Sequence, residues 1–578
     1  MQTKERSSVR SGDALSAAFR ATRPGFSTAI VFSFFINLLA FVGPLYMLQV
    51  YDRVITSRNE LTLLFITLLA AYLLIVYALL ERFRSAILVR LGMLFNEKTR
   101  DPLFKAVMRQ SVKAPQGGHA QALRDLDNVR EFSTGTGFIT FFDAPWIPIF
   151  VGACFLLHPW FGWAAVGGAI TIFVLALLNE MATRGPLNEA SRSSVAANQK
   201  ISAGIRNIEV AHAMSMVGPL HDRWRREHDN VLGWQAAASD KAGLLVAATK
   251  FTRAFLQVVS LGLGAYLAIK QEVTPGAMIA ASILMTRALA PVEAAVGSWK
   301  GFIGARIGYR RIKDLLSASP EPDQKVKLPE PKGQVSFEQV TATPPLAQTR
   351  VLFNVSFSLQ PGESLAVIGP SAAGKSSLVK VLVGVWPVLG GAVRMDGAEL
   401  SHWDAGQIGS SIGYLPQEVE LFSGTIAENI ARLGEVDDEA VIAAAQMAGV
   451  HDMIQKLPEG YNTLIGDGGA GLSGGQRQRL GLARAMYRLP ALIVLDEPNS
   501  NLDADGEAAL MAALQHLKEH KRTVILVTHK TNILAAVDKV LVLTNGQVQA
   551  FGARDEVLPK LAAAAAQAVP LRRVANAS

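Results

Sequence analysis

One short loop carries the strongest chemical signal in this sequence. Residues 369–377 read GPSAAGKSS and follow the apolar run from Ser364 to Ile368, which is typical of a buried strand. In such a loop the backbone N–H groups curl around phosphates, Lys375 supplies a positive charge and the Ser376 hydroxyl is suited to ligate Mg²⁺. We therefore predict a phosphate-binding loop at a helix N-terminus, built from Gly369, Pro370, Ser371, Ala372, Ala373, Gly374, Lys375, Ser376 and Ser377.

A pair of carboxylates follows later in the same half of the chain. The apolar run from Ala491 to Leu495 is typical of a central parallel strand, and it ends in Asp496 and Glu497. Asp496 is a candidate Mg²⁺ ligand, and Glu497 is a candidate base that accepts a proton from an attacking water. The alternative is an ordinary acidic cluster at a strand end.

Between these two motifs the sequence reads Leu472-Ser473-Gly474-Gly475-Gln476. With this pentapeptide in place, residues 333–560 resemble the ATP-binding cassette family. The resemblance implies ATP and Mg²⁺ as cofactors. It also implies that Gln417 meets Mg²⁺ and senses the γ-phosphate, that His529 contacts the γ-phosphate, and that Asp503 reports across a dimer seam.

In that family the pentapeptide serves the nucleotide of another cassette. The resemblance therefore implies that Ser473, Gly474, Gly475 and Gln476 close on the γ-phosphate held by a second copy of the chain. Since each chain has one cassette, we expect a homodimer with two ATP molecules between the subunits. ATP would join the cassettes and hydrolysis would release them, which would switch the exposure of a central path.

Three positions depart from the family pattern. No Tyr, Phe or Trp lies between Phe337 and Phe353, where cassettes often stack an aromatic ring on adenine. Ala372 and Ala373 stand where glycine or serine is common, so a positive φ there would cost some strain. Asn499 replaces a frequent threonine. None of these changes removes a group that the chemistry requires.

The N-terminal half has the composition of a membrane domain. The whole chain is 50% hydrophobic and 18% charged, with a mean hydropathy of +0.25. Its long apolar stretches predict six transmembrane helices, at about 27–50, 60–80, 137–157, 160–179, 254–269 and 275–297. The expected fold class is thus a membrane α-helical domain of exporter type followed by an α/β P-loop NTPase domain with antiparallel β and α-helical subdomains.

The distribution of basic residues predicts the orientation. Residues 1–24 carry Lys4, Arg6, Arg10, Arg20 and Arg23, and two long connections are also basic, whereas the turn around His158 holds no Lys or Arg. Positive charge on the inner side then places both termini in the cytoplasm. Arg287 and Glu293, in the sixth span, are six residues apart and cannot share a helix face, so we predict no direct pair between them.

We expect five segments along the chain. Residues 1–24 form a cytoplasmic segment without a signal peptide or peptidase domain, 25–316 the membrane domain, 317–332 a Pro-rich linker, 333–561 the cassette, and 562–578 a tail. Residues 122–132 and 207–216 have helical apolar spacing and are interpreted as coupling helices or, alternatively, as solvated helices. Cys154, the only cysteine, is expected to pack in the third span.

Two further segments resemble one branch of exporters. Residues 44–53 (PLYMLQVYDR) and 141–146 (FFDAPW) are similar to the ATPase subunit of type I protein secretion systems without a peptidase domain. The resemblance implies a bacterial inner-membrane protein that recruits a periplasmic membrane-fusion adaptor and an outer-membrane channel. Its substrate would be an unfolded, repeat-rich, protease-like polypeptide with a C-terminal signal.

Other interpretations stay open at this point. Tyr51, Arg53 and Trp146 are residue types that are also common at any membrane interface. The chain could be a half-size exporter of lipids or small molecules, or a membrane regulator that does not transport. The net charge of +8 fits anionic lipid headgroups, and no nucleic-acid motif accompanies it.

Overall fold

The computed structural model describes residues 11–114, 118–320, 325–345, 347 and 349–568. The chain divides into two compact units, Met1–Glu321 and Pro322–Ser578, which we call the N-terminal and C-terminal units. The basic residues Lys4, Arg6 and Arg10 of the expected N-terminal segment, and the pair Arg572-Arg573 of the expected tail, lie outside the described residues.

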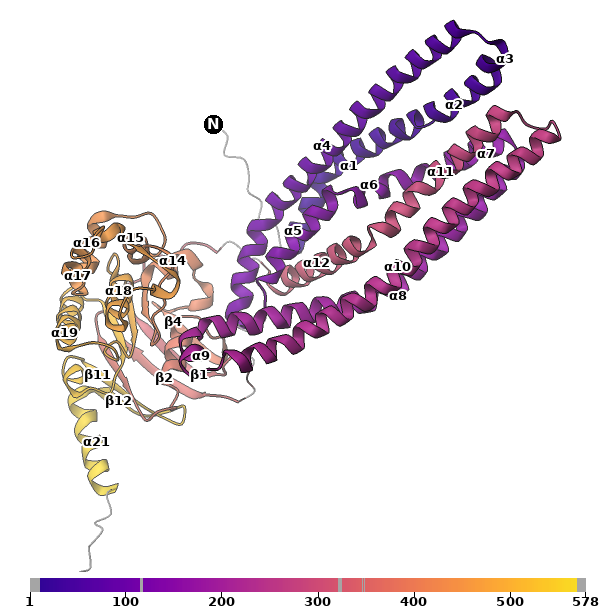
Figure 1. The fold of residues 1–578 in the computed structure, drawn as a ribbon. Coiled ribbons are helices and arrows are strands. Elements are labelled where there is room, and N and C mark those ends of the chain that lie inside the picture. The colour runs from indigo at the N-terminus through magenta and orange to yellow at the C-terminus, as the bar shows by residue number, and fades with distance from the viewer. Residues whose placement is uncertain (1–10, 115–117, 321–324, 346, 348, 569–578) are drawn as a thin grey trace, which may run out of the picture. The chain divides into compact units, whose positions relative to one another are not determined.

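The N-terminal unit is helical (Figure 1). Six segments of the described chain are long and apolar enough to cross a membrane, which confirms the number of predicted spans. Several are much longer than a crossing requires, since α4 has 54 residues and α10 has 53. The helices are α1 (Ser11–Leu39), α2 (Val42–Gln49), η1 (Val50–Val54), α3 (Ile55–Ser57), α4 (Glu60–Lys113), α5 (Gln121–Thr134), α6 (Thr136–Asp143), η2 (Ala144–Trp146), α7 (Ile147–Leu157), α8 (Pro159–Arg206), α9 (Ile208–Ala213), α10 (Val217–Ile269), α11 (Pro275–Gly297) and α12 (Trp299–Ala318).

The first span is not one continuous helix, as the apolar run 27–50 alone suggested. It breaks at Ala40 and Phe41, between α1 and α2. Pro44 explains the break, because a proline removes one helical hydrogen bond and its ring clashes with the carbonyl four residues earlier. Phe41 then stacks on Phe150 of α7 at 4.9 Å between ring centroids, and this contact holds the break against the helix bundle.

The segment predicted at 122–132 forms α5, whose Ala122 and Leu126 are buried. Asp125 on the same face accepts a hydrogen bond from Arg311 of α12 at 2.6 Å. Burial raises the pKa of Asp125, an effect that Arg311 and Gln121 oppose. The segment predicted at 207–216 contains the short helix α9, with exposed Ile208, Val210 and Met214 nearby. The coupling role of both segments stays a prediction.

The core of the N-terminal unit includes Phe150, Phe161 and Met285 from three different helices. Cys154 is completely buried in this core, which confirms its predicted packing role. Helix α12 ends at Ala318, so it includes the first two residues of the expected linker 317–332.

Two larger sheets form the C-terminal unit. A four-stranded antiparallel sheet has the order β2-β1-β4-β5, and a six-stranded sheet has the order β12-β11-β3-β10-β9-β6. In the six-stranded sheet all neighbouring pairs are parallel except β11 with β12. Strands β3, β9 and β10 are nearly continuous apolar runs and are buried, as expected for parallel strands covered on both faces.

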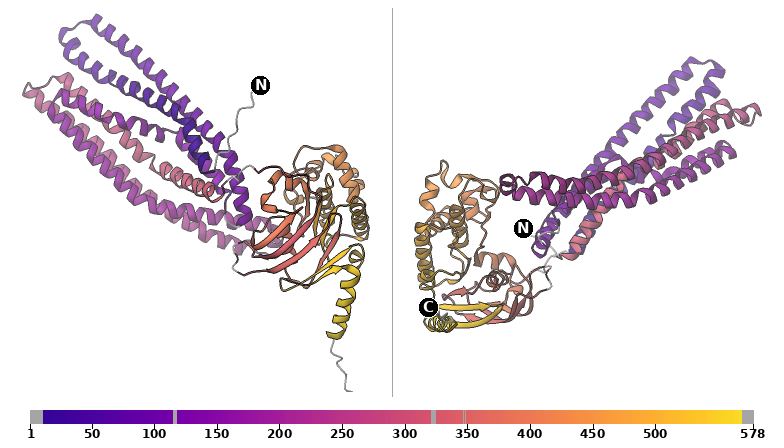
Figure 2. Two further views of the ribbon diagram at one scale, coloured as in Figure 1. Left: turned by 180° about the vertical axis from the view of Figure 1, so that it is seen from behind. Right: turned by 60° about the horizontal axis from the view of Figure 1, so that its bottom comes forward.

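The strands are β1 (Val335–Ala342), β2 (Leu352–Leu359), β3 (Ser364–Ile368), β4 (Val388–Met395), β5 (Ala398–Glu399), β6 (Ile412–Leu415), β7 (Gly424–Thr425), β8 (Leu464–Ile465), β9 (Leu492–Asp496), β10 (Thr523–Val527), β11 (Lys539–Thr544) and β12 (Gln547–Ala553). The helices are α13 (Lys375–Leu382), η3 (Leu400–His402), α14 (Ala405–Ser411), α15 (Ile426–Ile430), α16 (Asp438–Met447), α17 (His451–Gln455), η4 (Gly460–Asn462), η5 (Asp467–Gly469), α18 (Gly474–Met486), α19 (Ala504–Glu519), α20 (Thr531–Leu534) and α21 (Arg554–Ala568). Figure 2 shows the strands from behind, with helices α15 to α18 grouped beside them. The carboxyl ends of β3, β6, β9 and β10 meet at one edge of the six-stranded sheet, and the candidate site is built there.

Candidate nucleotide site

The phosphate loop leaves the end of β3 and enters α13, as predicted. Gly369 has φ 155° and Gly374 has φ 100°, values that favour glycine. A Cβ on Gly369 would lie 2.1 Å from the carbonyl oxygen of Leu543, so no other residue fits there without a shift. Lys375 is only 7% exposed. Its ammonium group donates hydrogen bonds to the carbonyl oxygens of Gly369 and Pro370, both at 2.9 Å.

Ala372 has φ 64°, so the strain expected from an alanine at this place in the loop is present. Its neighbour Ala373 is buried, and the Ala373 carbonyl accepts a hydrogen bond from the N–H of Gly546 at 3.0 Å. The loop is therefore held from the side by the turn between β11 and β12. Pro370, Ser371 and Ser377 complete the nine-residue segment 369–377 that the sequence singled out.

Asp496 lies at the end of β9 and is 1% exposed. The Ser376 hydroxyl donates to its Oδ1 at 3.3 Å, so the two predicted metal ligands are adjacent. Burial raises the pKa of Asp496, and the hydrogen bond from Ser376 opposes that shift. A hydroxyl beside one carboxylate fits Mg²⁺, a hard cation that takes oxygen ligands and usually binds few protein groups together with phosphates.

Glu497 follows with φ 51°, and its N–H donates to the carbonyl of Val527 on β10 at 3.1 Å. Gln417, two residues after β6, is exposed and donates from Nε2 to Glu497 Oε2 at 3.1 Å. The structure thus brings the candidate base and the candidate γ-phosphate sensor into direct contact.

A buried glutamine that sequence reasoning missed holds the backbone of Glu497. Gln478, 1% exposed on α18, donates from Nε2 to the Glu497 carbonyl at 3.1 Å and to the Ser500 hydroxyl at 3.3 Å. Its Oε1 accepts from the N–H of Asn501 at 3.1 Å. The available signal was its position, because Gln478 falls on the apolar face of α18 with Leu482 and Ala485, where a polar side chain needs partners.

The Ser473 pentapeptide starts α18. Ser473 accepts from the N–H of Gln476 at 3.2 Å, and Gln476 accepts from the N–H of Ser473 at 2.8 Å, which together form a capping box. Gly474 and Gly475 make up the first turn, and a Cβ on Gly475 would lie 2.8 Å from the carbonyl oxygen of Asn501. Ser473 itself is exposed at this helix N-terminus.

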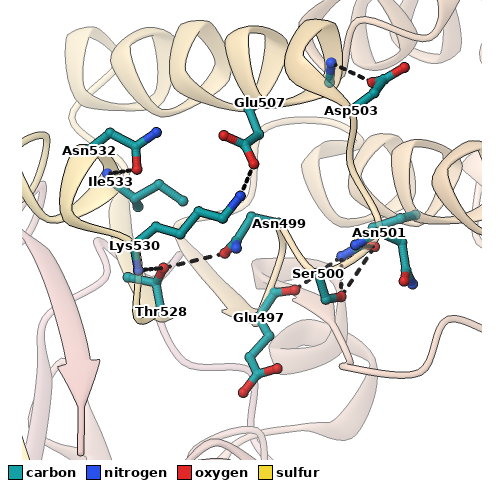
Figure 3. A network of polar contacts seen from close by, with 12 residues as sticks. Glu497, Asn499, Ser500, Asn501, Asp503, Glu507, Thr528, Lys530, Asn532 and Ile533 are labelled. Carbon is teal, nitrogen blue, oxygen red and sulfur yellow. Dashed lines mark hydrogen bonds and ion pairs between the residues drawn. The ribbon is translucent and has the colours of Figure 1, made fainter.

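The remaining predicted residues, Asp503 and His529, occupy neighbouring loops, and Figure 3 labels Asp503, Asn499 and Thr528 among the residues there. Asp503 is exposed and caps α19 by accepting from the N–H of Gly506 at 2.9 Å. His529 is also exposed and follows Thr528, whose hydroxyl donates to Asn499 Oδ1 at 3.3 Å. Asn499, the departure from the usual threonine, therefore joins the loop after Glu497 to the loop that carries His529, and Lys530 pairs with Glu507 beside them.

The expected place for adenine holds no aromatic ring between Phe337 and Phe353. Phe337 is buried and stacks on Phe357 at 4.5 Å. Phe353 is 37% exposed at the start of β2, and its N–H donates to the carbonyl of Gly546 at 2.9 Å. A Cβ on Gly546 would lie 3.0 Å from the Phe353 ring, so this exposed ring lies beside the turn that holds the phosphate loop at Ala373.

Comparison with known proteins identifies the family of this chain. Residues 352–500 match the family model described as ABC transporter, and residues 26–292 match the model described as ABC transporter transmembrane region. The chain belongs to the ABC transporter family. This ABC transporter is therefore a multi-pass membrane protein that binds nucleotide and couples ATP hydrolysis to transport.

Two relatives and one solved structure resemble this ABC transporter along most of its length. It is 44% identical to the type I secretion system ATP-binding protein PrsD of Rhizobium meliloti (strain 1021), over 94% of each chain. It is 28% identical to the leukotoxin translocation ATP-binding protein LktB of Mannheimia haemolytica, over 92% of this chain and 76% of the relative. A bacterial Atm1-family ABC exporter with ATP bound superposes with a TM-score of 0.81 at 20% identity, over 95% of this chain and 100% of that one, which shows a shared fold.

Proposed function

We propose that this ABC transporter is the ATPase and permease subunit of a type I secretion system that exports an unfolded polypeptide. The observation that carries the proposal is the 44% identity to PrsD over 94% of both chains. A repeat-rich, protease-like polypeptide with a C-terminal signal is the expected passenger. The match includes both segments that resemble secretion exporters, residues 44–53 and 141–146.

Both of those segments join helices of the membrane domain. Asp52 accepts hydrogen bonds from the Thr274 hydroxyl at 2.5 Å and from the Gly276 N–H at 2.8 Å, at the start of α11. Asp143 accepts from Arg84 at 2.6 Å and from Asn37 at 3.0 Å. We infer that these segments resemble those of secretion exporters because they set the arrangement of helices, rather than because they contact the passenger.

Within the cassette, we assign the roles from the contacts described above. Lys375 and the loop 369–377 would hold the phosphates, and Ser376, Asp496 and Gln417 would hold Mg²⁺. When bound, Mg²⁺ neutralises charge on the phosphates and orients them for attack. Glu497 accepts the proton of the attacking water, and the amide of Gln417 keeps the Glu497 carboxylate oriented.

We propose a homodimer with two ATP molecules at the seam between cassettes. The exposed N-terminus of α18 at Ser473 supports this, since the backbone N–H groups of a helix N-terminus suit an anion. Asp503, Gln476 and His529 would contribute on the same seam. Two further partners, a periplasmic adaptor and an outer-membrane channel, follow from the type I assignment.

The proposed location is the bacterial inner membrane with both termini in the cytoplasm. The basic residues of segment 1–24 and of the long connections support this orientation. We propose the domain limits 25–316 for the membrane domain and 333–561 for the cassette, joined by 317–332 and followed by 562–578.

Crosslinking followed by co-purification tests the function. The transporter is purified from its own cells after treatment with a bifunctional reagent, with and without ATP, and bound proteins are identified by mass spectrometry. We expect an adaptor and an unfolded secreted polypeptide. Stimulation of ATP hydrolysis by lipids or drugs alone, with no polypeptide or adaptor crosslinked, would contradict the proposal.

A further inference from the structure

Arg287 is the only Lys or Arg that the sequence places within the six expected spans. At about 1.5 Å per residue, it lies roughly 18 Å from the first residue of α11 and roughly 15 Å from the last. That is the middle of a hydrocarbon core of about 30 Å. A charged side chain at this depth is costly, and such residues face the protein interior or a water-filled cavity.

The Arg287 side chain is exposed in this chain and lies on an uncovered strip of α11. Ala290, Ala294 and Gly297 are exposed along the same helix face, and a Cβ on Gly297 would meet nothing within 4 Å. Helix α11 is more enclosed than the other spans, since 50% of its most apolar stretch is buried, against at most 28% in the other five. Figure 1 shows α11 between the α1/α4 pair and the α8/α10 pair.

No carboxylate is available to neutralise Arg287 at that depth. The six expected spans contain Glu60, Asp143 and Glu293. Glu293 pairs with Arg253 at 3.2 Å, Asp143 pairs with Arg84 at 2.6 Å, and Glu60 is the first residue of α4, at the end of its span.

A second copy of the chain would bring the same three acids, two of them paired and the third, Glu60, at the end of its span. Lipid phosphates lie beyond the ends of the core, roughly 15 Å away, which exceeds the reach of an arginine side chain. Arg287 must therefore be solvated by water or neutralised by a group that passes through the membrane domain.

We propose that Arg287 faces a water-filled export path and binds carboxylate side chains of the passing polypeptide. This inference rests on the proposed function, and it adds one specific contact, between Arg287 and carboxylate groups of the exported polypeptide. A guanidinium group matches a carboxylate with two parallel hydrogen bonds, which a lysine cannot do. The small residues at 290, 294 and 297 leave space for an extended backbone beside it.

Cysteine labelling tests whether the strip is hydrated. Cys154 is buried and is the only native cysteine, so single substitutions can be labelled selectively in the full-length protein in proteoliposomes. Arg287→Cys and Ala290→Cys are treated with a charged, membrane-impermeant methanethiosulfonate reagent. The controls are Ala288→Cys, at a completely buried position on the same helix, and Leu68→Cys, at a 58% exposed position of α4.

We expect both strip variants to react about tenfold faster or more than both controls, because only a hydrated thiol ionises readily to the reactive thiolate. Equal rates for Arg287→Cys and Leu68→Cys would overturn the placement of Arg287 on a hydrated path. Wild type treated with the same reagent reports any background from Cys154.

Protection by a peptide tests the carboxylate contact. Labelling of the Ala290→Cys variant, which keeps Arg287, is repeated after incubation with a soluble Glu-Gly repeat peptide or its Gln-Gly counterpart. We expect the acidic peptide to slow Ala290→Cys labelling several-fold more than the neutral one, and to lose this preference when Arg287 is replaced. Equal protection by both peptides, or protection by phosphatidylglycerol vesicles without peptide, would overturn the contact.

The two failures are distinguishable. Labelling lost at the strip while the transporter still crosslinks to a passenger would overturn the role of Arg287 alone. Labelling retained with no polypeptide bound in any assay would overturn the proposed function and, with it, the carboxylate contact.

Discussion

Gln478 links the helix that begins at Ser473 to the backbone that carries Glu497, and Gln478→Met tests this link. Methionine has nearly the same length and is apolar, so it fills the space but removes the contacts. The substitution deletes the hydrogen bonds to the Glu497 carbonyl, the Ser500 hydroxyl and the Asn501 N–H, at 3.1, 3.3 and 3.1 Å.

Each such bond contributes about 1 kcal/mol net, so the arrangement of the loop loses about 2–3 kcal/mol. At about 1.4 kcal/mol per factor of ten, this corresponds to a fall of about 30- to 150-fold in the population of the correctly placed Glu497. We expect kcat for ATP hydrolysis to fall by that factor. The affinity for ATP should change little, because the contacts of Lys375 and Ser376 are untouched.

The assay measures steady-state ATP hydrolysis and, separately, nucleotide binding by titration on the detergent-purified transporter. Gln515→Met is the matched control, since Gln515 is exposed on α19 and its side chain donates a hydrogen bond to Glu519, away from the candidate site. A kcat within a factor of two of wild type for Gln478→Met, or an equal loss of ATP affinity, would refute the reasoning.

Three other substitutions address the cassette. Glu497→Gln should keep ATP binding and stall hydrolysis, because an amide cannot take the proton from water; brisk turnover of this variant in a phosphate-release assay would refute its role as base. Lys375→Ala should cripple nucleotide binding, and a near-normal Kd by titration would count against the phosphate contact. Phe353→Ala should weaken ATP binding by several-fold if the exposed ring supports adenine, since aromatic contacts contribute about 0.5–1.5 kcal/mol, with Phe422→Ala, at another exposed ring, as control.

Local sequence patterns were sufficient for the phosphate loop and for the number of spans. The glycines at 369 and 374 occur because a side chain there would strain or clash, and this requirement is visible in the sequence itself. The buried strand β3 is an apolar run that leads into the loop before Lys375, and the apolar run of β9 ends at Asp496, so their order and spacing were informative. Pro44 also indicates a helix break, although the apolar run 27–50 by itself predicts one continuous span.

Contacts between distant residues could not be read in this way. The position of Gln478 on the apolar face of α18 indicates that its side chain needs hydrogen-bond partners. The sequence does not indicate that these partners are residues 497–501. The ion pairs Arg84–Asp143 and Arg253–Glu293 join residues that are 59 and 40 positions apart in the sequence, and no local sequence pattern predicts such pairs. Partner choice for a buried charge depends on how helices pack, and that is a property of the whole unit.

The length of helices α4, α8 and α10 has a mechanical consequence. A continuous helix of 53 residues, such as α10, is a stiff rod about 80 Å long at 1.5 Å per residue. A tilt of only about 5° about one end of such a rod moves the other end by roughly 7 Å, more than the pitch of a helical turn. A small rotation at one end of these helices therefore produces a displacement at the other end that is wide enough to open or close a passage for a peptide backbone.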